Sequence, residues 1–231
     1  MYILFYHRNC WRTEAIGYNS FTSIYIESSS SEAPGFGSGI GVRGIPFSPL
    51  FTLPYNKWMK EVIIVRHGNW NLVDDQLTEQ VKTRCIELKP RLGSFAIAIS
   101  SPFGRTQETA RLLSGLEPSV DERAGILKSP PEFSQRVAKL RKTDPFGVAG
   151  AIISIPELRE PLRGQGQHLV DLTRETLSQL SDDQRALIVS HDGTIAAAEK
   201  VLTEASFDEI DHTYGELEGF RIDETMQITR L

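Results

Sequence analysis

The stretch VIIVRHG, residues 62–68, places four consecutive β-branched side chains directly before an arginine, a histidine and a glycine. An uninterrupted run of this kind is typical of a strand that is buried on both faces of a parallel sheet. Open parallel sheets bind ligands beyond the carboxyl ends of their strands. Arg66 and His67 follow the run at once, so they are the first candidates for a functional role.

Two later apolar runs end in the same way. The stretch IAISSPFGR, residues 97–105, leads to Arg105, and the stretch LIVSHDG, residues 187–193, leads to His191 and Asp192. If the three strands are neighbours in one sheet, two arginines and two histidines meet at its edge. A guanidinium presents a planar fork of donors and keeps its charge, so such a pocket is suited to a phosphoryl group.

From residue 61 onward, short apolar runs alternate with helical patterns. This alternation predicts an α/β domain, a three-layer sandwich with a mainly parallel central sheet flanked by helices. The expected strands are 62–65, 95–100, 119–120 and 186–190, with two short strands within 215–223 and 226–231. The expected helices are 78–89, 105–114, 131–142, 168–180 and 194–202. The long connection 121–166 is predicted to form a lid that selects the substrate.

Residues 1–58 show no sustained period of 2 or 3.6 and contain a serine run and a glycine-rich stretch at 35–44. We interpret them as a poorly ordered leader or a spurious N-terminal extension. Met59 opens directly onto the first core strand, which predicts that the native chain starts there and that 59–231 is the catalytic domain. The rival interpretation is a targeting peptide, because the leader is rich in serine and poor in acids.

Charge and cysteine content exclude several classes of partner. The chain has 25 Lys and Arg against 30 Asp and Glu, a net charge of -5, without a basic stripe, so nucleic acid is not an expected partner. Cys10 and Cys85 form no CxxC pair, which favours a reducing, cytoplasmic location. No apolar run approaches membrane-spanning length, and neither a metal motif nor a cofactor motif is present, so we expect no membrane contact, metal or cofactor.

The four strand-end residues have distinct chemical roles in this interpretation. His67 is the predicted nucleophile, because a histidine with an ordinary pKa near ~6.5 is neutral often enough to attack phosphorus and form a covalent intermediate. Arg66 and Arg105 bind the phosphoryl oxygens and stabilise the charge that develops on them. His191 is expected to hydrogen-bond the same oxygens from the other side.

Taken together, these motifs resemble the histidine phosphatase superfamily, also called the phosphoglycerate mutase-like family, over nearly all of 61–231. The similarity rests on RHG at 66–68, LTE at 77–79, SSPFGRTQETA at 100–110 and SHDG at 190–193. The resemblance implies a branch-1-like domain in which the histidine of the RHG motif becomes the phosphohistidine. It also implies that Arg66, Arg105 and His191 complete the phosphate pocket.

Two departures from the family pattern concern phosphate binding and the leaving group. About two residues are missing after the RHG motif, and Asn71 is a further candidate for contacting phosphate. Ile126 stands where the family commonly has the glutamate that protonates the leaving oxygen. Four carboxylates are candidate replacements: Asp192, Glu122, Glu132 and Glu160. The alternative role of Asp192 is to cap the helix that follows it, and a substrate with a good leaving group, such as protein phosphohistidine, would need no acid.

The leading prediction is therefore a metal-independent phosphatase that hydrolyses a phosphomonoester or phosphoramidate through a phosphohistidine at His67. Its substrate would be a small phosphorylated metabolite or a phosphoprotein. Two alternatives remain open: a mutase-like phosphotransfer, and a noncatalytic module that binds phosphate. The sequence indicates neither the natural substrate nor the oligomeric state.

Overall fold

The structure, a computed structural model, describes residues 2–7, 10–15, 60–71 and 75–231. The chain divides into two units, with the boundary after residue 51. In the first unit, strands β1 (Tyr2–His7) and β2 (Cys10–Ala15) pair antiparallel, and the sequence patterns indicated neither. The rest of the predicted leader, 16–58, and the predicted start at Met59 lie outside the described residues.

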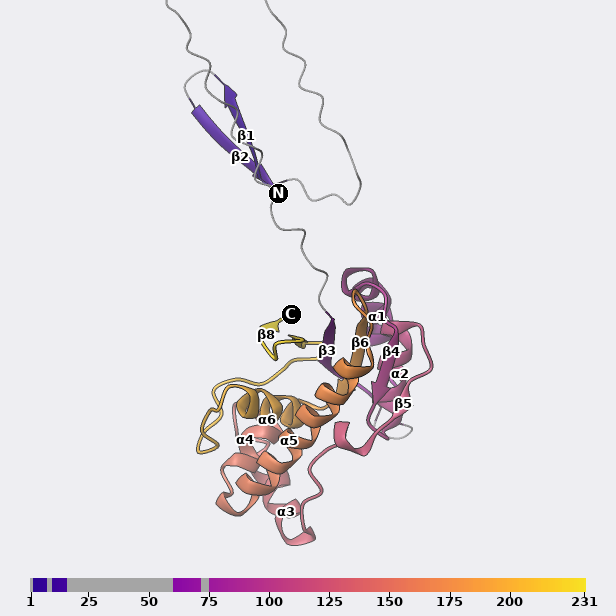
Figure 1. Cartoon of the computed structure of the whole chain (residues 1–231). Coiled ribbons are helices and arrows are strands. Elements are labelled where there is room, and N and C mark those ends of the chain that lie inside the picture. Colours follow the sequence, from indigo (N-terminus) through magenta and orange to yellow (C-terminus); the bar gives the residue numbers. More distant parts are fainter. Residues whose placement is uncertain (1, 8–9, 16–59, 72–74) are drawn as a thin grey trace, which may run out of the picture. The chain divides into compact units, whose positions relative to one another are not determined.

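A mixed sheet of six strands organises the second unit (Figure 1). Its strands are β3 (Glu61–Arg66), β4 (Ile97–Ser100), β5 (Ser119–Val120), β6 (Arg185–Ser190), β7 (Gly219–Asp223) and β8 (Ile228–Arg230). In space their order is β5-β4-β6-β3-β7-β8; the first four are parallel, and β7 and β8 run antiparallel to their neighbours. The expected α/β class and the mainly parallel sheet are therefore confirmed.

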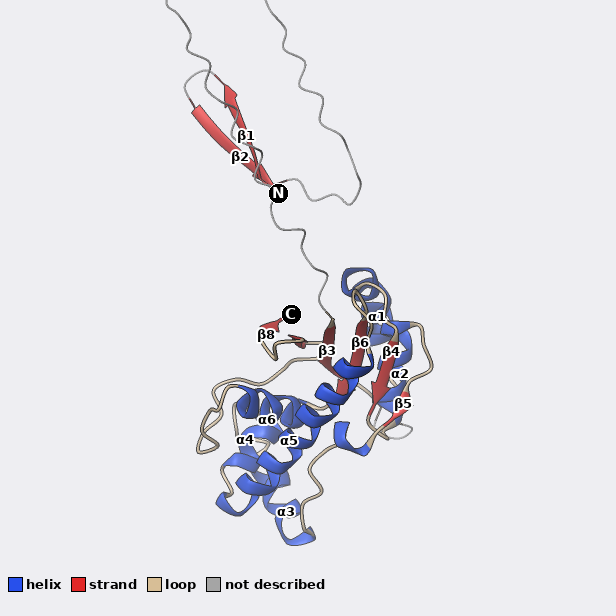
Figure 2. Cartoon of the chain, viewed as in Figure 1, coloured by secondary structure: helices blue, strands red, loops and turns tan. Residues whose placement is uncertain are grey.

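Helices cover both faces of this sheet, as Figure 2 shows. They are α1 (Glu79–Leu92), α2 (Gly104–Ser114), α3 (Pro131–Leu140), α4 (Gly147–Ile153), α5 (Pro156–Gln179) and α6 (Asp192–Leu202), with a short 3-10 turn, η1 (Glu122–Ala124). Helices α1 and α2 pack on one face, whereas α5 and α6 pack on the other. The three-layer arrangement is as expected.

The central strand β3 shows why this sequence needs two helical layers. Ile63 and Val65 join the core cluster shared with α1 and α2, whereas Val62 and Ile64 join the cluster shared with α5 and α6. Successive side chains of a strand point to opposite faces, so an unbroken apolar run has to be covered on both. All four side chains are at most 1% exposed.

The connection 121–166 contains more helix than the sequence patterns indicated. Helix α4 was not expected, and α5 begins at Pro156 instead of 168. Glycines and prolines in this region normally interrupt helices, but a proline in the first turn of a helix is favoured. Gly166 allows close packing, because a Cβ there would lie 2.6 Å from the backbone carbon of Ala197 in α6.

Helix α3 belongs to this connection, and none of its residues is fully buried. Its apolar side chains Phe133, Val137 and Leu140 pack, half-buried, against a third core cluster that also includes residues of α4, α5 and α6. In the part of the chain that the structure describes, no helix has both the length and the apolar character needed to cross a membrane.

Candidate active site

The carboxyl ends of β3, β4 and β6 lie at one edge of the sheet. Strand β6 is hydrogen-bonded to both of the others, with Arg66 opposite Ser190 and Ser100 opposite Val189. The three strands that the sequence placed before the RHG, SSPFGR and SHDG stretches are therefore neighbours, as the convergence argument required. His67 and His191, which follow two of them, have ring centroids 5.0 Å apart.

His67 has a defined tautomer. Its Nδ1 lies 2.7 Å from the carbonyl oxygen of Gly68, and because a carbonyl only accepts, Nδ1 is the nitrogen that carries the hydrogen. The lone pair is then on Nε2, which accepts from Nε of Arg105 at 3.3 Å. The nitrogen that is able to attack a phosphorus atom thus faces one of the two predicted phosphate-binding arginines.

Burial keeps this imidazole neutral. His67 is 4% exposed, and desolvation, aided by the charges of Arg105 and Arg66, lowers its pKa to about 4, against the opposing effect of the Gly68 carbonyl. A pKa of about 4 leaves the ring unprotonated at neutral pH. The electrostatics of the pocket therefore maintain His67 in the form that a nucleophile needs.

Gly68 is required by close packing against helix α1. A Cβ at this position would lie 2.0 Å from Cγ1 of Val81. The backbone N–H of Gly68 also donates to the hydroxyl of Thr109 in α2 at 3.3 Å. The turn that follows His67 is thereby held between two helices, which fixes the direction of the His67 ring.

The guanidinium of Arg105 is enclosed by aromatic rings and a carboxylate. It stacks on Trp70 at 4.5 Å and on Phe103 at 4.4 Å from the ring centroids. Its Nη1 lies 2.5 Å from Oδ1 of Asp75. Stacking and ion pairing orient the fork of donors before any ligand is bound.

Arg66 keeps part of its donor capacity unused. One nitrogen, Nη1, donates to the carbonyl of Tyr214 at 2.6 Å and lies 3.9 Å from Oδ2 of Asp192. Its Nε is buried and has no hydrogen-bond partner among the residues that the structure describes. Buried donors are nearly always satisfied in folded proteins, so an unsatisfied one at this edge is suited to an anionic ligand.

His191 is held from both sides. Its Nε2 lies 2.9 Å from the hydroxyl oxygen of Ser101, and its ring makes an edge contact with Phe103 at 5.1 Å between centroids. Burial lowers its pKa to about 2, and the nearby charges of His67, Arg105 and Arg66 act in the same direction. Both histidines are therefore neutral across the physiological range.

Of the candidate proton donors, Asp192 lies beside the predicted phosphate pocket, with its Oδ2 3.9 Å from Nη1 of Arg66. It is the first residue of α6, whose N-cap is His191, so the alternative that Asp192 caps the helix was wrong. Glu122 is 67% exposed and pairs with Lys128. The remaining two candidates, Glu132 and Glu160, are exposed on α3 and α5.

Asn71 takes part in the turn after the RHG motif through its backbone. Its N–H donates to the carbonyl of Gln76 at 2.8 Å, and its carbonyl accepts from the N–H of Asp75 at 3.0 Å. The residue is exposed. Its predicted contact with phosphate stays a prediction.

Four residues of the site, among them Phe103, were not identified from the sequence. Ser101 stands within the SSPFGR stretch, directly after a strand, and that position was the signal that could have indicated it. Trp70 and Asp75 reach the pocket only because the turn after the RHG motif folds back, with Trp70 forming a bridge to Leu77. A tertiary contact of this kind has no local sequence signature.

The site as a whole combines an unprotonated imidazole nitrogen, two guanidinium groups and a second neutral imidazole at one sheet edge. Such a set can bind a phosphoryl group and stabilise charge on its oxygens. Within the described ranges, no three His, Cys, Asp or Glu side chains are placed to share a metal ion.

No family model and no curated protein matches the chain. Solved structures do resemble it. Phosphoserine phosphatase from Entamoeba histolytica, in complex with 3-phosphoglyceric acid, has a TM-score of 0.51 at 19% identity and covers 74% of this chain and 95% of its own. YhfR from Bacillus stearothermophilus has a TM-score of 0.52 at 19% identity, with the same coverage. Phosphoglycerate mutase from Bacillus anthracis has a TM-score of 0.51 at 19% identity and covers 76% and 93%. The described part of the second unit therefore has the phosphoglycerate mutase-like fold of these solved structures.

Proposed function

We propose that the protein is a phosphatase that hydrolyses a phosphomonoester or phosphoramidate through a phosphohistidine at His67. The observation that carries the proposal is the orientation of His67, whose unprotonated Nε2 faces Nε of Arg105 at 3.3 Å. The likeness to solved phosphatases supports the reaction class. A nucleophile that points into a cationic pocket is the arrangement that phosphoryl transfer to a side chain needs.

In the first step Nε2 of His67 attacks phosphorus, and the bond from phosphorus to the leaving oxygen breaks. Arg66 and Arg105 neutralise the negative charge of the phosphoryl oxygens. His191 donates a hydrogen bond to one of these oxygens, in the tautomer whose N–H is not used within the protein. In the second step water attacks phosphorus, the bond from phosphorus to Nε2 breaks, and phosphate leaves. His67 is then neutral again and ready for another cycle.

The leaving oxygen of an ester needs a proton, and we assign this role to Asp192. Its carboxyl group stands beside His191 at the start of α6, with a side chain that is 21% exposed. In its acid form it gives a proton to the leaving oxygen, and its carboxylate later takes one from the attacking water. Glu122 is a weaker choice because its carboxylate is solvated and paired with Lys128.

The test is phosphate release from p-nitrophenyl phosphate, whose good leaving group makes the first step independent of the acid. The wild-type protein should turn over, and His67→Ala should lose at least a thousandfold in kcat with unchanged circular dichroism. His168→Ala is the matched control, because His168 is exposed on α5, and it should retain activity. Rapid denaturation at alkaline pH during turnover should trap an acid-labile, base-stable phosphoprotein in the wild type and in His168→Ala, but not in His67→Ala.

Other outcomes point to the two alternatives. A folded wild-type protein that binds phosphate but releases none from any ester would be a binding module. A phosphoprotein that forms but passes its phosphoryl group to an added alcohol faster than to water would be a mutase. Full activity in His67→Ala would overturn the assignment of the nucleophile.

A further inference from the structure

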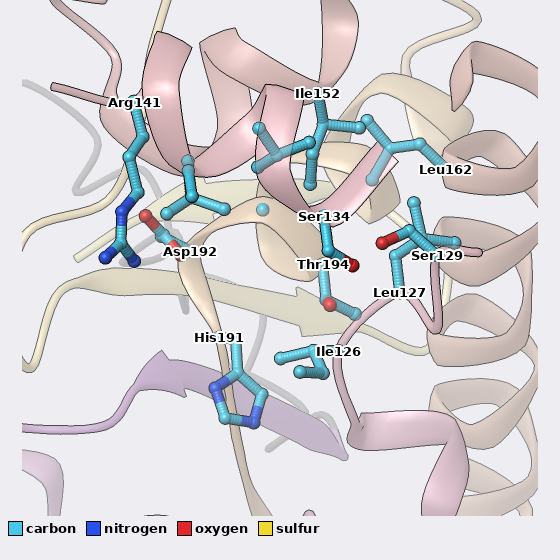
Figure 3. A pocket seen from close by; sticks show the side chains of 14 residues that line it. Ile126, Leu127, Ser129, Ser134, Arg141, Ile152, Leu162, His191, Asp192 and Thr194 are labelled. Carbon is cyan, nitrogen blue, oxygen red and sulfur yellow. The ribbon is translucent and has the colours of Figure 1, made fainter. Parts of the chain in front are cut away.

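A cavity of about 230 Å³ adjoins the phosphate pocket (Figure 3). His191 and Asp192, at the start of α6, border it on one side, and helices α3 and α4 close it on the other. Because the His191 ring lines the cavity and also contacts His67, the cavity lies next to the nucleophile proposed above. A group attached to that phosphoryl has this cavity beside it.

The wall of the cavity is mainly apolar and comes from five segments of the chain. Six aliphatic side chains line it: Ile126, Leu127, Val137, Val148, Ile152 and Leu162. Figure 3 shows the four of them that are labelled, Ile126, Leu127, Ile152 and Leu162, around one open space. Ile126 is 42% exposed although it is a large aliphatic residue, and it lines this cavity.

The polar groups of the cavity do not form a recognition site for a charged or hydroxylated molecule. The hydroxyl of Thr194 already donates to the carbonyl of Gly125 at 2.7 Å. Arg141 and Asp192 also border the neighbouring cavity that Arg66 lines, which places both at the boundary between the two. Away from this boundary and from the His191 ring, the wall offers the hydroxyls of Ser129, Ser134 and Thr194 and is otherwise formed by aliphatic residues and Gly193.

We propose that this apolar cavity receives the leaving group, so that the substrates are phosphomonoesters of apolar aryl or alkyl alcohols. The inference rests on the proposed phosphatase function and narrows its substrate class. An apolar cavity of roughly 150 Å³ accommodates a benzene ring. The larger volume here suits a substituted ring or an alkyl chain of about six carbons.

The energetic reason is the different cost of filling this cavity with apolar or polar groups. Each methylene that moves from water into the aliphatic wall gains about the transfer free energy of one buried CH₂, which is roughly a fourfold gain in affinity. A sugar or a second carboxylate would lose hydrogen bonds to water that this wall does not replace. The cavity therefore selects by exclusion of polar leaving groups as well as by attraction of apolar ones.

The experiment measures binding separately from catalysis. Affinities of ethyl, butyl and hexyl phosphonate, which are not hydrolysed, are determined by calorimetry at constant pH and ionic strength. We expect Kd to fall roughly fourfold per added methylene until the cavity is full. 3,4-Dihydroxybutyl phosphonate, a hydroxylated ligand of the same length as butyl phosphonate that is likewise not hydrolysed, should bind no better than ethyl phosphonate.

Two variants on helix α3 form a matched pair. Val137 lines the cavity, whereas Leu140 is half-buried on the same helix and does not. Val137→Asn should flatten the dependence of Kd on chain length, whereas Leu140→Asn should keep it. Thermal melts of both variants would show whether they lose similar stability, so that a change in slope reports the cavity wall.

The results separate the two proposals. If Kd does not depend on chain length while p-nitrophenyl phosphate is turned over, the apolar leaving-group site is overturned and the phosphatase function stands. Chain-length dependence without turnover of any ester would support the cavity as a binding site and overturn the phosphatase function. If Val137→Asn kept the wild-type dependence of Kd on chain length, the inference would also be contradicted, because the wall would then not be in contact with the ligand.

Discussion

Asp75 and Arg105 form an ion pair at the phosphate pocket, with Oδ1 and Nη1 2.5 Å apart. The carboxylate occupies donors that a phosphate would use, so it competes with an anionic ligand. We expect Asp75→Asn to lower the inhibition constant of inorganic phosphate about three- to fivefold. The effect is limited to under about 1 kcal/mol because the Asp75 side chain is 34% exposed and water screens its charge.

Glu216→Gln is the control for this prediction. Glu216 pairs with Arg84 at 3.1 Å, away from the phosphate pocket, so its neutralisation removes a carboxylate without changing the site. The inhibition constant of inorganic phosphate for Glu216→Gln should stay at the wild-type value. A weaker inhibition by phosphate in Asp75→Asn would mean that Asp75 acts mainly to orient Arg105.

Asp192→Asn tests the proton donor. The substitution keeps the shape of the side chain and removes the transferable proton. Hydrolysis of ethyl phosphate should slow about a hundredfold, because its alkoxide is a poor leaving group, whereas p-nitrophenyl phosphate should slow far less. The ratio of the two kcat/KM values is the measurement, and Glu122→Gln should leave it unchanged. A selective loss in Glu122→Gln instead would assign the donor to Glu122.

Gly68→Ala tests the packing behind the nucleophile. Its Cβ would overlap Cγ1 of Val81, so the variant should lose about 1–3 kcal/mol of stability and most of its activity. Val81→Ala removes the overlapping methyl groups. In the double variant the free energy of unfolding, measured in urea, should exceed the additive expectation by at least about 1 kcal/mol. Simple additivity would show that the overlap is relieved elsewhere.

The two buried histidines make stability depend on pH. In the folded protein the pKa values of His67 and His191 are lowered to about 4 and about 2, while both return to about 6.5 on unfolding. Below pH 6.5 the unfolded chain therefore binds more protons than the folded one, and stability falls as pH falls. When the pH is lowered from 7 to 5, each histidine should lower the free energy of unfolding by about 2 kcal/mol.

Urea denaturation at both pH values measures this dependence. His191→Gln removes one of the two groups, so its loss of stability between pH 7 and pH 5 should be about 2 kcal/mol smaller than that of the wild type. His168→Gln, which alters an exposed histidine, should keep the wild-type loss. An unchanged loss in His191→Gln would show that His191 is not desolvated as described.

The sheet and the edge that carries the candidate site could be predicted from the sequence because each depends on a local pattern. A run of buried apolar residues identifies a strand wherever it pairs, and the residues after it are then placed at a strand end. Helix α4 and the first half of α5 were missed because Gly150 and Pro161 are helix breakers on average. Here tertiary packing overrides that tendency: Gly150, for instance, packs so closely that a Cβ would overlap the side chain of Asp144.

The positions of Asp75 and Trp70 in the site could not be predicted from the sequence. Their contacts with Arg105 connect positions about thirty residues apart, through a turn whose path follows from packing and not from any repeat. The apolar cavity is a similar case. Its wall combines residues from the loop after η1, from three helices and from the start of α6, and no segment alone indicates a hollow between them.

The place of β3 in the sheet has a consequence for how the protein is made. This strand is synthesised before the other strands of its sheet, yet its partners on either side are β6 and β7, which end at Ser190 and Asp223. Until β6 has left the ribosome, β3 of the nascent chain has no partner strand. The apolar run of β3 is then exposed to other chains. Assembly of the domain is therefore delayed until late in translation, when non-local pairing becomes possible, and this interval is when aggregation or chaperone binding would occur.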